Sequence, residues 1–473
     1  MASTFHVENF GCRAARADGE AICDRLRASG LSELHPSQAE VVVVNTCSVT
    51  AEADRAARAF IRRTHRLNPA ASIVVTGCYA QRAPQELAHL TGVAAVVGNS
   101  HKALAPEIVL SLLGSEAPRA SDGLVQLRAA TNLKRAKSEQ LAAPQVVVWA
   151  DDAFAHSFLE GPQIAPGAQT RPNLKIQEGC GNRCTFCVIP STRGPSKSLP
   201  HAAVLRQVEG FVAAGGNELV LSGINLGRWG WDLSDSVPRT LADLVRKIFE
   251  QTSLPWLRLS SIEPMDWDEE LIGLMAEFGG SRLARHAHLP LQSGSDAVLR
   301  RMHRRYRPWH YAEKVAALVQ AAGAELTLGA DVMVGFPGET DAEFEETAAL
   351  IESLPFGYLH LFPFSPRPST IGCALHAERP VAAEAVEERM KALRTLAAQK
   401  SAAHRRCFVG RELVAITLHT PAELAARDRT LALSENFLPV EIVGRIEANQ
   451  LVRSRVTGLN AEGMLEAVPG GHL

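Results

Sequence analysis

Short apolar runs alternate with helical stretches over the first 113 residues. The strand-like runs are Thr4–Glu8, Val41–Asn45, Ser72–Thr76 and Val93–Val97. The helical stretches are Asp18–Ser29, Ala51–Leu67, Pro84–Leu90 and His101–Leu112. This alternation predicts a parallel sheet with crossover helices, which places residues 1–113 in the α/β class.

The pattern changes over residues 114–171. This segment contains a basic stretch, NLKRAKSEQ, and a Pro- and Gly-rich stretch, EGPQIAPGAQTRP, around one apolar run, Gln145–Ala150. We interpret it as a linker with one strand. Its few basic residues are either a solvated surface or a contact for RNA.

Strand and helix patterns alternate again from Asn173 to about Ser365. The expected strands are Leu174–Gln177, Glu218–Ser222, Trp256–Ser261, His286–Leu291, Leu326–Val334 and Tyr358–Phe364. The helical stretches between them include His201–Ala214, Leu241–Gln251, Glu269–Phe278, Tyr311–Ala322 and Glu343–Leu354. Six such units predict a partial (β/α)6 TIM-like barrel, and with a trailing helix, Pro380 to about Arg406, this domain spans residues 172–406.

The last part of the chain, residues 407–473, contains short strand patterns at close spacing. They are Glu412–His419, Thr430–Ser434, Leu438–Val443, Gln450–Thr457 and Met464–Val468. Such spacing predicts a small β-barrel of the oligonucleotide-binding size class. Basic residues are sparse there and only Phe437 stands out as a stacking aromatic, so a structural cap without a ligand is the alternative.

Composition narrows the class of protein. The chain has 473 residues with 46% hydrophobic and 21% charged residues, and a formal net charge of −2. These values are ordinary for a globular protein, and any nucleic-acid contact must rest on local basic patches. Neither an apolar run long enough to cross a bilayer nor a secretory signal is visible, so we expect a cytoplasmic protein.

Three cysteines cluster in the stretch EGCGNRCTFCVIP, where Cys180, Cys184 and Cys187 follow the first barrel strand. In a reducing compartment, clustered thiols favour metal binding over disulfides. A loop with this spacing can present three thiolates to a cubane iron–sulfur cluster and leave one iron open to a small molecule. The alternatives are a zinc site completed by a residue such as His201, or three unrelated buried cysteines.

A second group of cysteines follows the strands of the N-terminal domain. Cys12, Cys47 and Cys78 come after the first, second and third of its main strands. Because the carboxyl ends of parallel strands share one rim, these thiols are expected to meet there and to form a second three-thiolate site. The alternative is that each is a small buried hydrophobe.

Polar and glycine-rich loops follow the other barrel strands. Those ends are the usual place for a ligand, and amide, hydroxyl and carboxylate groups can hold an amino acid and a ribose. The candidate cofactor-binding residues are Gly223, Asn225, Glu263, Gln292, Ser293 and Gly335. Taken singly, each of these loops is equally well read as a plain turn.

Several segments resemble one family in order along the chain. LKIQEGCGNRCTFCVIPSTRGPSKS resembles the radical S-adenosylmethionine (SAM) signature of the methylthiotransferases, and the flanking segments NTCSVTAEADRAARAFIRR, HLPLQSGSDAVLRRMHRRY and DVMVGFPGETDAEFEET continue the match. NTCSVT and RLSSIEP are most similar to the branch that acts on N6-threonylcarbamoyladenosine in tRNA. Ser191 stands where that branch usually has Tyr, and Ser369 replaces the Gly of its SxRPGT segment.

The resemblance implies an N-terminal methylthiotransferase domain, a radical SAM core and a C-terminal RNA-binding TRAM domain. It also implies two 4Fe-4S clusters. Cys180, Cys184 and Cys187 would hold the cluster that binds SAM, and Cys12, Cys47 and Cys78 the auxiliary cluster that carries the sulfur. Low-pKa thiolates are expected at all six positions. Arg193 is the expected catalytic residue.

The implied activity is insertion of a methylthio group at C2 of N6-threonylcarbamoyladenosine next to the anticodon, with SAM cleavage as the source of the radical. The partners would be the tRNA anticodon stem-loop, SAM, a reducing electron donor and an unknown sulfur donor, and we expect a monomer. Two basic runs are candidate phosphate contacts, although each also fits a solvated face. They are Arg300, Arg301, Arg304, Arg305 and Arg307, and Arg55, Arg58, Arg62 and Arg63.

Other functions remain open on the sequence. The substrate is alternatively isopentenyladenosine in tRNA or a ribosomal protein aspartate, and a non-enzymatic alternative is a zinc-containing RNA-binding protein. Metal analysis separates the last case, because two four-iron clusters give about eight irons per chain. Cys23, Cys373 and Cys407 lack a partner spacing and are expected to be ordinary cysteines, and His6, His65 and His303 structural or exposed.

Overall fold

The computed structural model describes residues 3–114, 146–158, 160–161, 164, 166, 169–233 and 239–472. The chain divides into two compact units, Met1–Ser48 with Glu52–Gly161, and Val49–Ala51 with Pro162–Leu473. Most of the predicted linker lies outside the described residues. The strand expected at Gln145–Ala150 is present as β6, Val147–Trp149, and it pairs with the last main strand of the first unit.

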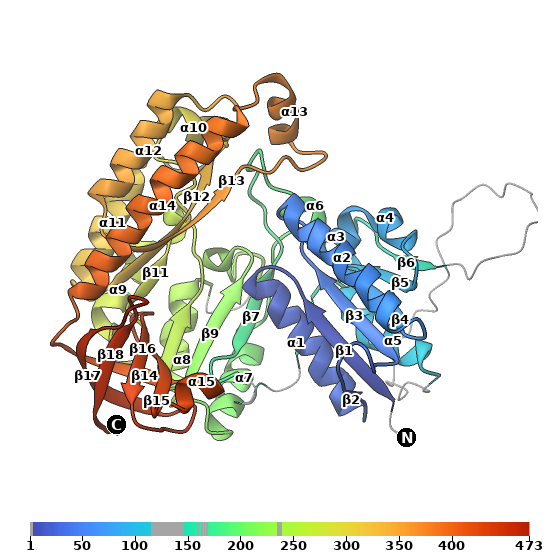
Figure 1. The fold of residues 1–473 in the computed structure, drawn as a ribbon, viewed down its shortest axis with the longest axis horizontal. Helices are drawn as coiled ribbons and strands as arrows, with labels where there is room; N and C mark the ends of the chain where they lie inside the picture. The colour runs from blue at the N-terminus through green and yellow to red at the C-terminus, as the bar shows by residue number, and fades with distance from the viewer. Residues whose placement is uncertain are drawn as a thin grey trace, which may run out of the picture. The chain divides into compact units, whose positions relative to one another are not determined.

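The first unit contains one parallel sheet of six strands in the order β2-β1-β3-β4-β5-β6 (Figure 1). The strands are β1 Thr4–Asn9, β2 Ser32–Glu33, β3 Val41–Thr46, β4 Ser72–Gly77, β5 Val93–Gly98 and β6 Val147–Trp149. The helices are α1 Arg13–Ala28, α2 Ala51–Leu67, α3 Cys78–Arg82, α4 Pro84–Ala88 and α5 Ala105–Leu112. The predicted parallel α/β sheet is confirmed.

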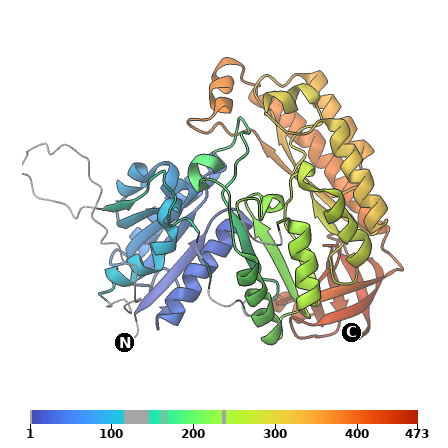
Figure 2. The same cartoon turned by 180° about the vertical axis from the view of Figure 1, so that it is seen from behind.

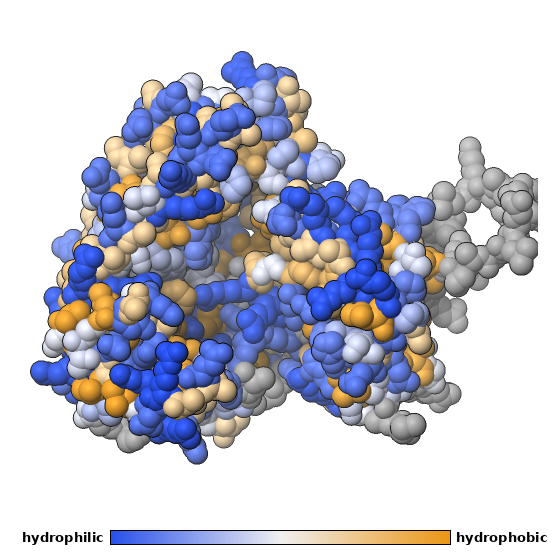
Figure 3. All heavy atoms as spheres, viewed as in Figure 1, coloured by the Kyte–Doolittle hydropathy of each residue, from blue (hydrophilic) through white to orange (hydrophobic). Residues whose placement is uncertain are grey.

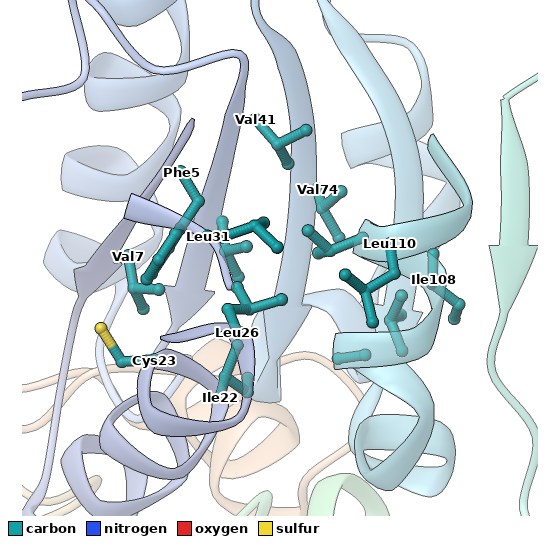
Figure 4. Packing of buried hydrophobic residues seen from close by; sticks show 14 of the residues in the cluster. Phe5, Val7, Ile22, Cys23, Leu26, Leu31, Val41, Val74, Ile108 and Leu110 are labelled. Atoms are coloured by element: carbon teal, nitrogen blue, oxygen red, sulfur yellow. The ribbon is translucent and has the colours of Figure 1, made fainter. Parts of the chain in front are cut away.

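Alternate residues of each strand point to opposite faces of this sheet, and helices cover both faces. Val41 and Val43 pack with α1 and α5 on one face, and Val42 and Val44 pack with α2 and α4 on the other. Figure 4 shows the first of these clusters, in which Cys23 is one of the buried side chains. Burial raises the pKa of the Cys23 thiol to about 12, which fits its predicted role as an ordinary core residue.

One predicted helix of this unit differs from the structure. The stretch expected as a single helix over His101–Leu112 is a 3-10 helix, Asn99–Leu104, followed by α5. Pro106 lies in the first turn of α5, where its missing N–H costs nothing, but it cannot continue an α-helical hydrogen-bond ladder from the preceding turn. The proline therefore divides the stretch in two.

The second unit begins with the strands of the predicted barrel. β9 Glu218–Gly223 pairs in parallel with β7 Asn173–Glu178 and β10 Trp256–Leu259, and β12 Thr327–Val334 pairs in parallel with β11 His286–His288 and β13 Phe356–Pro363. The short strand β8 Lys197–Ser198 runs antiparallel to β7. A parallel bridge links Leu257 of β10 to Leu283, three residues before β11.

Helices follow the barrel strands and cover their outer side (Figures 1 and 2). They are α6 Ile189–Arg193, α7 His201–Ala213, α8 Leu241–Gln251, α9 Glu269–Phe278, α10 Asp296–Arg301, α11 Pro308–Ala322 and α12 Asp341–Ser353. Two further helices, α13 Ile371–Glu378 and α14 Ala383–Arg406, follow β13. The start of α12 is set by a capping box, in which Thr340 and Glu343 each accept a hydrogen bond from the other's backbone N–H.

The C-terminal strands form a closed barrel in the order β14-β15-β16-β18-β17. They are β14 Glu412–Thr417, β15 Arg429–Ser434, β16 Pro439–Val443, β17 Leu451–Leu459 and β18 Leu465–His472, and a short helix, α15 Ala422–Ala425, lies between the first two. The predicted small barrel is confirmed.

On the face of the protein drawn in Figure 3, hydrophobic residues occur in small groups between hydrophilic ones.

Phe437 does not have the exposed position expected of a stacking aromatic. Its ring centroid lies 4.4 Å from that of His286 and 5.6 Å from that of Tyr358, both on barrel strands, and the Arg258 guanidinium lies 5.3 Å from the ring. The half-buried ring packs the small barrel against the larger one, and a stacking contact of Phe437 with RNA stays a prediction. Among the described residues, no helix is long and apolar enough to cross a membrane.

Candidate cluster and cofactor sites

The loop that carries Cys180, Cys184 and Cys187 begins directly after β7 and ends in α6. The backbone N–H of Cys180 donates to the carbonyl of Gly194 at 3.1 Å, and that of Cys187 donates to the carbonyl of Cys184 at 3.1 Å. Backbone N–H groups also face two of the sulfur atoms, from Asn182 to Cys180 Sγ and from Ile189 to Cys187 Sγ, each at 3.4 Å. Such donors stabilise negative charge on the sulfurs.

A buried ion-pair network closes the base of this loop. Glu178 accepts from Arg193 Nη1 at 2.7 Å and from Lys175 Nζ at 2.8 Å, and the side chains of all three are at most 4% exposed. Glu178 comes two residues before Cys180, and Arg193 follows Cys187 by six. The structure thus places Arg193 where it ties the two ends of the cysteine loop together, and its direct catalytic role stays a prediction.

Gln177 holds the loop from the strand beneath it, and the sequence did not single this residue out. Its side-chain amide nitrogen donates to the carbonyls of Glu178 and Gly179, each at 2.8 Å, and its amide oxygen accepts from the backbone N–H of Asn225 at 2.7 Å. The Asn225 amide nitrogen lies 3.8 Å from Cys180 Sγ. The loops after β7 and β9 therefore meet beside the cysteines.

Arg304 is buried against the cysteine loop rather than exposed. Its Nη1 donates to Cys184 Sγ at 3.2 Å, and its Nη2 pairs with Glu263 at 2.5 Å. The side chain is only 4% exposed. Its predicted contact with RNA phosphates is wrong, because burial against the cysteine loop removes it from the surface. In the sequence, Arg304 is one of five arginines in a charged run, and nothing in that run indicates that its side chain is buried.

The rest of that basic run is engaged in ion pairs. Arg301 forms a two-pronged pair with Glu343, and Arg305 pairs with Asp266 at 3.2 Å. Arg300 and Arg307 both pair with Asp296, at 2.9 and 3.1 Å. These contacts lower the positive charge that is available to RNA. The run on α2 is more open, with Arg55, Arg62 and Arg63 exposed and Arg58 donating to the Tyr79 hydroxyl.

Burial affects the thiols of Cys180 and Cys187. Burial raises the pKa of Cys187 to about 12 and also raises the pKa of Cys180. For these two thiols desolvation outweighs the nearby N–H donors, and the deprotonated state expected of cluster ligands stays a prediction. Binding of iron must supply the free energy that removes their protons.

The N-terminal cysteines lie at the carboxyl ends of three adjacent strands, β1, β3 and β4. Thr46 and Gly77 are paired in register, so the residues that follow them, Cys47 and Cys78, emerge side by side. Cys12 caps the start of α1. The preceding Gly11 has a φ of 106°, and a side chain there would meet Cys47 Sγ at 2.8 Å, so the chain at Cys12 passes close to Cys47.

The strand order explains why these cysteines are neighbours. In an open sheet of order 2-1-3-4-5, the connections from β1 and from β3 lead to opposite edges of the sheet. The ligand site of such a sheet lies at this switch point, at the carboxyl ends of β1 and β3. Cys12 and Cys47 follow those two strands, and Cys78 follows the next. Cys12 is exposed and the other two are buried, and the Asn99 amide donates to Cys78 Sγ at 3.3 Å. Three thiols on one rim fit a three-thiolate cluster site.

The barrel rim carries polar atoms without a partner among the described residues. They are Ser222 Oγ, Asn225 Oδ1 and Gln292 Oε1, at the carboxyl ends of β9 and β11. Gln292 has a φ of 64°, a strained conformation for a residue other than glycine. Buried polar atoms of this kind are usually satisfied by a ligand or ordered water. The rim therefore fits a ligand rich in hydrogen-bonding groups, such as SAM.

The other predicted cofactor-binding residues have neighbours within the protein. Glu263 pairs with Arg304, and the Ser293 hydroxyl bonds to that of Thr347 at 3.0 Å. Gly335, with a φ of 75°, donates its backbone N–H to Glu339 at 2.8 Å. Gly223 ends β9, and a side chain there would meet Gln177 Cβ at 2.9 Å. A role of these four residues in holding a cofactor stays a prediction.

Two family models match the chain. The model described as Uncharacterized protein family UPF0004 matches residues 4–98, and the model described as Radical SAM superfamily matches residues 174–351. The first covers strands β1 to β5 with Cys12, Cys47 and Cys78, and the second covers the cysteine loop and the barrel strands as far as β12.

Curated relatives match almost the whole chain. A protein of Aquifex aeolicus named threonylcarbamoyladenosine tRNA methylthiotransferase MtaB is 32% identical over 94% of this chain and 98% of its own length. The protein of the same name in Bacillus subtilis is 35% identical over 78% of this chain and 75% of its own length. A Syntrophotalea carbinolica protein named tRNA-2-methylthio-N(6)-dimethylallyladenosine synthase is 31% identical over 80% of each chain.

A solved structure shares the fold. The radical SAM methyltransferase TsrM from Kitasatospora setae, solved with cobalamin and a [4Fe-4S] cluster, superposes with a TM-score of 0.52 at 16% identity, over 80% of this chain and 75% of TsrM. This likeness concerns the fold alone. The long matches to MtaB proteins, together with both family models, show that the chain belongs to the MtaB branch of the radical SAM methylthiotransferase family.

Proposed function

We propose that this protein transfers a methylthio group to C2 of N6-threonylcarbamoyladenosine next to the anticodon of tRNA. The observation that carries this substrate is the match to proteins named for that nucleoside over more than nine-tenths of the chain. Two three-cysteine groups, each at the carboxyl ends of a parallel sheet, support the reaction class. The tRNA substrate also favours a cytoplasmic location.

In this proposal Cys180, Cys184 and Cys187 hold one 4Fe-4S cluster, and the rim atoms of Ser222, Asn225 and Gln292 hold SAM beside it. The bound cluster and SAM would supply the one-electron chemistry that an unactivated ring C–H bond requires, which no side chain provides. The network of Glu178 with Arg193 and Lys175 keeps the cysteine loop in place. Preorganisation of this kind lowers the cost of positioning the reacting groups.

The second cluster would be held by Cys12, Cys47 and Cys78 on the rim of the N-terminal sheet. Its role in the proposal is to carry the sulfur that reaches the base. The target base has to leave its stack to reach either rim, which costs less in a single-stranded anticodon loop than in a duplex. The exposed arginines of α2 and the small C-terminal barrel are the proposed RNA contacts.

An assay with purified components tests the substrate. The protein, with both clusters reconstituted under anaerobic conditions, is incubated with SAM, a reductant and one of two tRNAs, which carry either N6-threonylcarbamoyladenosine or isopentenyladenosine. Nucleoside mass spectrometry is expected to find the methylthio product only on the first. A product on the isopentenyl nucleoside alone refutes the substrate and leaves the reaction class intact.

Variants separate the chemistry from the fold. Cys180→Ala and Cys47→Ala are each expected to lower iron from about eight to about four per chain and to abolish product, since each removes one cluster ligand. Cys373→Ala is the matched control, because Cys373 belongs to neither group and is expected to leave iron unchanged. Stoichiometric zinc in place of iron in the wild-type protein contradicts the enzyme proposal.

A further inference from the structure

Three side chains that no predicted function uses lie together on the neighbouring strands β11, β12 and β13. Asp331 is paired in register with His360, and His288 is paired with Gly329, two residues before Asp331. Residues two apart on a strand point to the same face. Strand register therefore brings His288, Asp331 and His360 to one face of the sheet.

The potential ligand atoms of these residues converge. One nitrogen from each histidine and one carboxylate oxygen all lie within 4.8 Å of one another. His288 Nε2 is 3.2 Å from Asp331 Oδ2, and His360 Nδ1 is 3.2 Å from Asp331 Oδ1. Ligand atoms that each lie about 2.0–2.2 Å from one tetrahedral zinc-class ion are about 3.3–3.6 Å apart. Each histidine nitrogen lies near that spacing from one oxygen of Asp331, and a single oxygen can serve both rings after rotation of the carboxylate or of the exposed His360 ring.

A second layer of groups orients His288 for such a role. Its Nδ1 lies 3.0 Å from the Tyr358 hydroxyl, which in turn lies 2.8 Å from His286 Nε2. When the Nδ1–H group donates a hydrogen bond to the tyrosine oxygen, Nε2 carries the lone pair of the ring. This lone pair is then available to a cation beside Asp331. Metal-binding histidines generally have an outer partner of this kind on the other ring nitrogen.

The carboxylate of Asp331 also suits a bound cation. Asp331 is 29% exposed and presents one carboxylate oxygen to each imidazole ring. A partly buried carboxylate that remains ionised favours a positive partner. His288 is 8% exposed whereas His360 is 63% exposed, so an ion has a path to the site from the His360 side.

We propose that His288, Asp331 and His360 form a binding site for a divalent transition-metal ion, separate from both cysteine groups. Two imidazole nitrogens and one carboxylate oxygen are a donor set typical of zinc, iron(II) and manganese. Three protein ligands leave at least one coordination position open, to water or to an oxygen of a bound molecule. The inference does not depend on the identity of the tRNA nucleoside.

The site adjoins the proposed SAM rim through the backbone. The N–H of Gln292 donates to the carbonyl of Asp331 at 2.8 Å, and the N–H of Met333 donates to the carbonyl of Gln292 at 2.9 Å. An ion bound by Asp331 would therefore lie beside the bridge between Gln292 and Val332, and Gln292 Oε1 is one of the rim atoms described above.

Manganese binding tests the proposal directly. The protein is first loaded with iron at both cysteine groups under anaerobic conditions, so that the thiols are occupied, and Mn²⁺ is then titrated and followed by electron paramagnetic resonance. Mn²⁺ prefers oxygen and nitrogen donors to thiolates, which directs it away from the cysteines. We expect one tightly bound Mn²⁺ per chain, with nitrogen hyperfine coupling from imidazole, and its displacement by Zn²⁺.

Two variants and one control make the result specific. Asp331→Asn and His360→Ala are expected to weaken Mn²⁺ binding at least about tenfold, the range seen for loss of a ligand or its support. His360 is mostly exposed, so its replacement is expected to leave the fold intact. His35→Ala, an exposed histidine of the first unit, is expected to bind Mn²⁺ as the wild type does.

Two results overturn the proposal. The first is an absence of stoichiometric Mn²⁺ or Zn²⁺ binding by the iron-loaded wild-type protein, which identifies the three residues as a hydrogen-bond network only. The second is unchanged binding by both Asp331→Asn and His360→Ala, which places the ion elsewhere. Circular dichroism of each variant shows whether weakened binding reflects loss of the ligand or loss of the fold.

Discussion

Arg304 offers the sharpest test of the proposed cluster site, because it touches both a cysteine and a carboxylate. Its guanidinium donates to Cys184 Sγ at 3.2 Å and pairs with Glu263 at 2.5 Å, and the side chain is 4% exposed. Arg304→Met keeps most of the buried volume and removes the charge and the hydrogen bonds donated to Cys184, Glu263 and Tyr306. If Cys184 binds the cluster, the positive charge stabilises the reduced cluster more than the oxidised one.

The size of the effect follows from that contact. A hydrogen bond to a charged group contributes about 1.5–3 kcal/mol. For one electron, with about 59 mV for each tenfold change, this corresponds to a potential more negative by about 65–130 mV. Glu263, whose side chain is 22% exposed, then lacks its cation and shifts the potential further in the same direction. The cluster is therefore expected to become harder to reduce.

A redox titration followed by electron paramagnetic resonance measures this shift in the reconstituted protein, with iron content checked in parallel. Arg300→Met is the matched control, because Arg300 belongs to the same basic run but is 60% exposed and pairs with Asp296 at the surface. Its potential is expected to equal that of the wild type. An unchanged potential in Arg304→Met, with both clusters fully loaded, refutes the assignment of Arg304 to the cluster.

Three further predictions concern stability. Lys102→Met removes the cation that faces buried Asp18 at 2.8 Å, and it should destabilise the first unit by about 3–5 kcal/mol in denaturant unfolding. Burial, with Arg405 nearby, lowers the pKa of His404 to about 4. An unfolded histidine has a pKa of about 6.5. Between about pH 6.5 and about pH 4 the histidine is therefore protonated in the unfolded chain but neutral in the folded one. The free energy of unfolding should fall by about 3 kcal/mol as the pH drops from about 6.5 to about 4. Ser369 has a φ of 66°, so Ser369→Gly should raise stability by up to about 1 kcal/mol.

Each of these predictions has its own control. The double variant Lys102→Met with Asp18→Leu should recover much of the lost stability, since no charge then stays buried. Failure to recover any points to lost packing instead. His404→Gln keeps a hydrogen-bonding group near Thr327 without a titrating ring, and an unreduced pH slope in this variant contradicts the assignment. A lower melting temperature in Ser369→Gly would show that the left-handed serine is not strained.

Both cysteine groups could be located from the sequence, for different physical reasons. Cys180, Cys184 and Cys187 are close in the chain, so their spacing alone brings them together. Cys12 and Cys47 are distant in the chain, but the alternation of strands and helices places each at a carboxyl strand end, and a parallel sheet gathers those ends on one rim. Periodic patterns are enough to predict this kind of arrangement.

Arrangements that depend on strand register or on packing between domains could not be predicted. Arg304 stands among exposed arginines in the sequence, and only the fold turns it towards Cys184. Phe437 has the local context of an exposed ring, yet it packs on the strands of the larger barrel. His288 and His360 meet at Asp331 because three strands pair in one particular register, and a shift of one residue would separate them.

The most direct test of the central claim is the nucleoside composition of tRNA from a strain that lacks this protein. Digested tRNA from the deletion strain, the parent and a strain complemented with the Cys180→Ala variant is compared by mass spectrometry. We predict that 2-methylthio-N6-threonylcarbamoyladenosine disappears from the deletion and variant strains, while N6-threonylcarbamoyladenosine accumulates. Unchanged 2-methylthio-N6-threonylcarbamoyladenosine, with loss of a different methylthio product, would contradict the account.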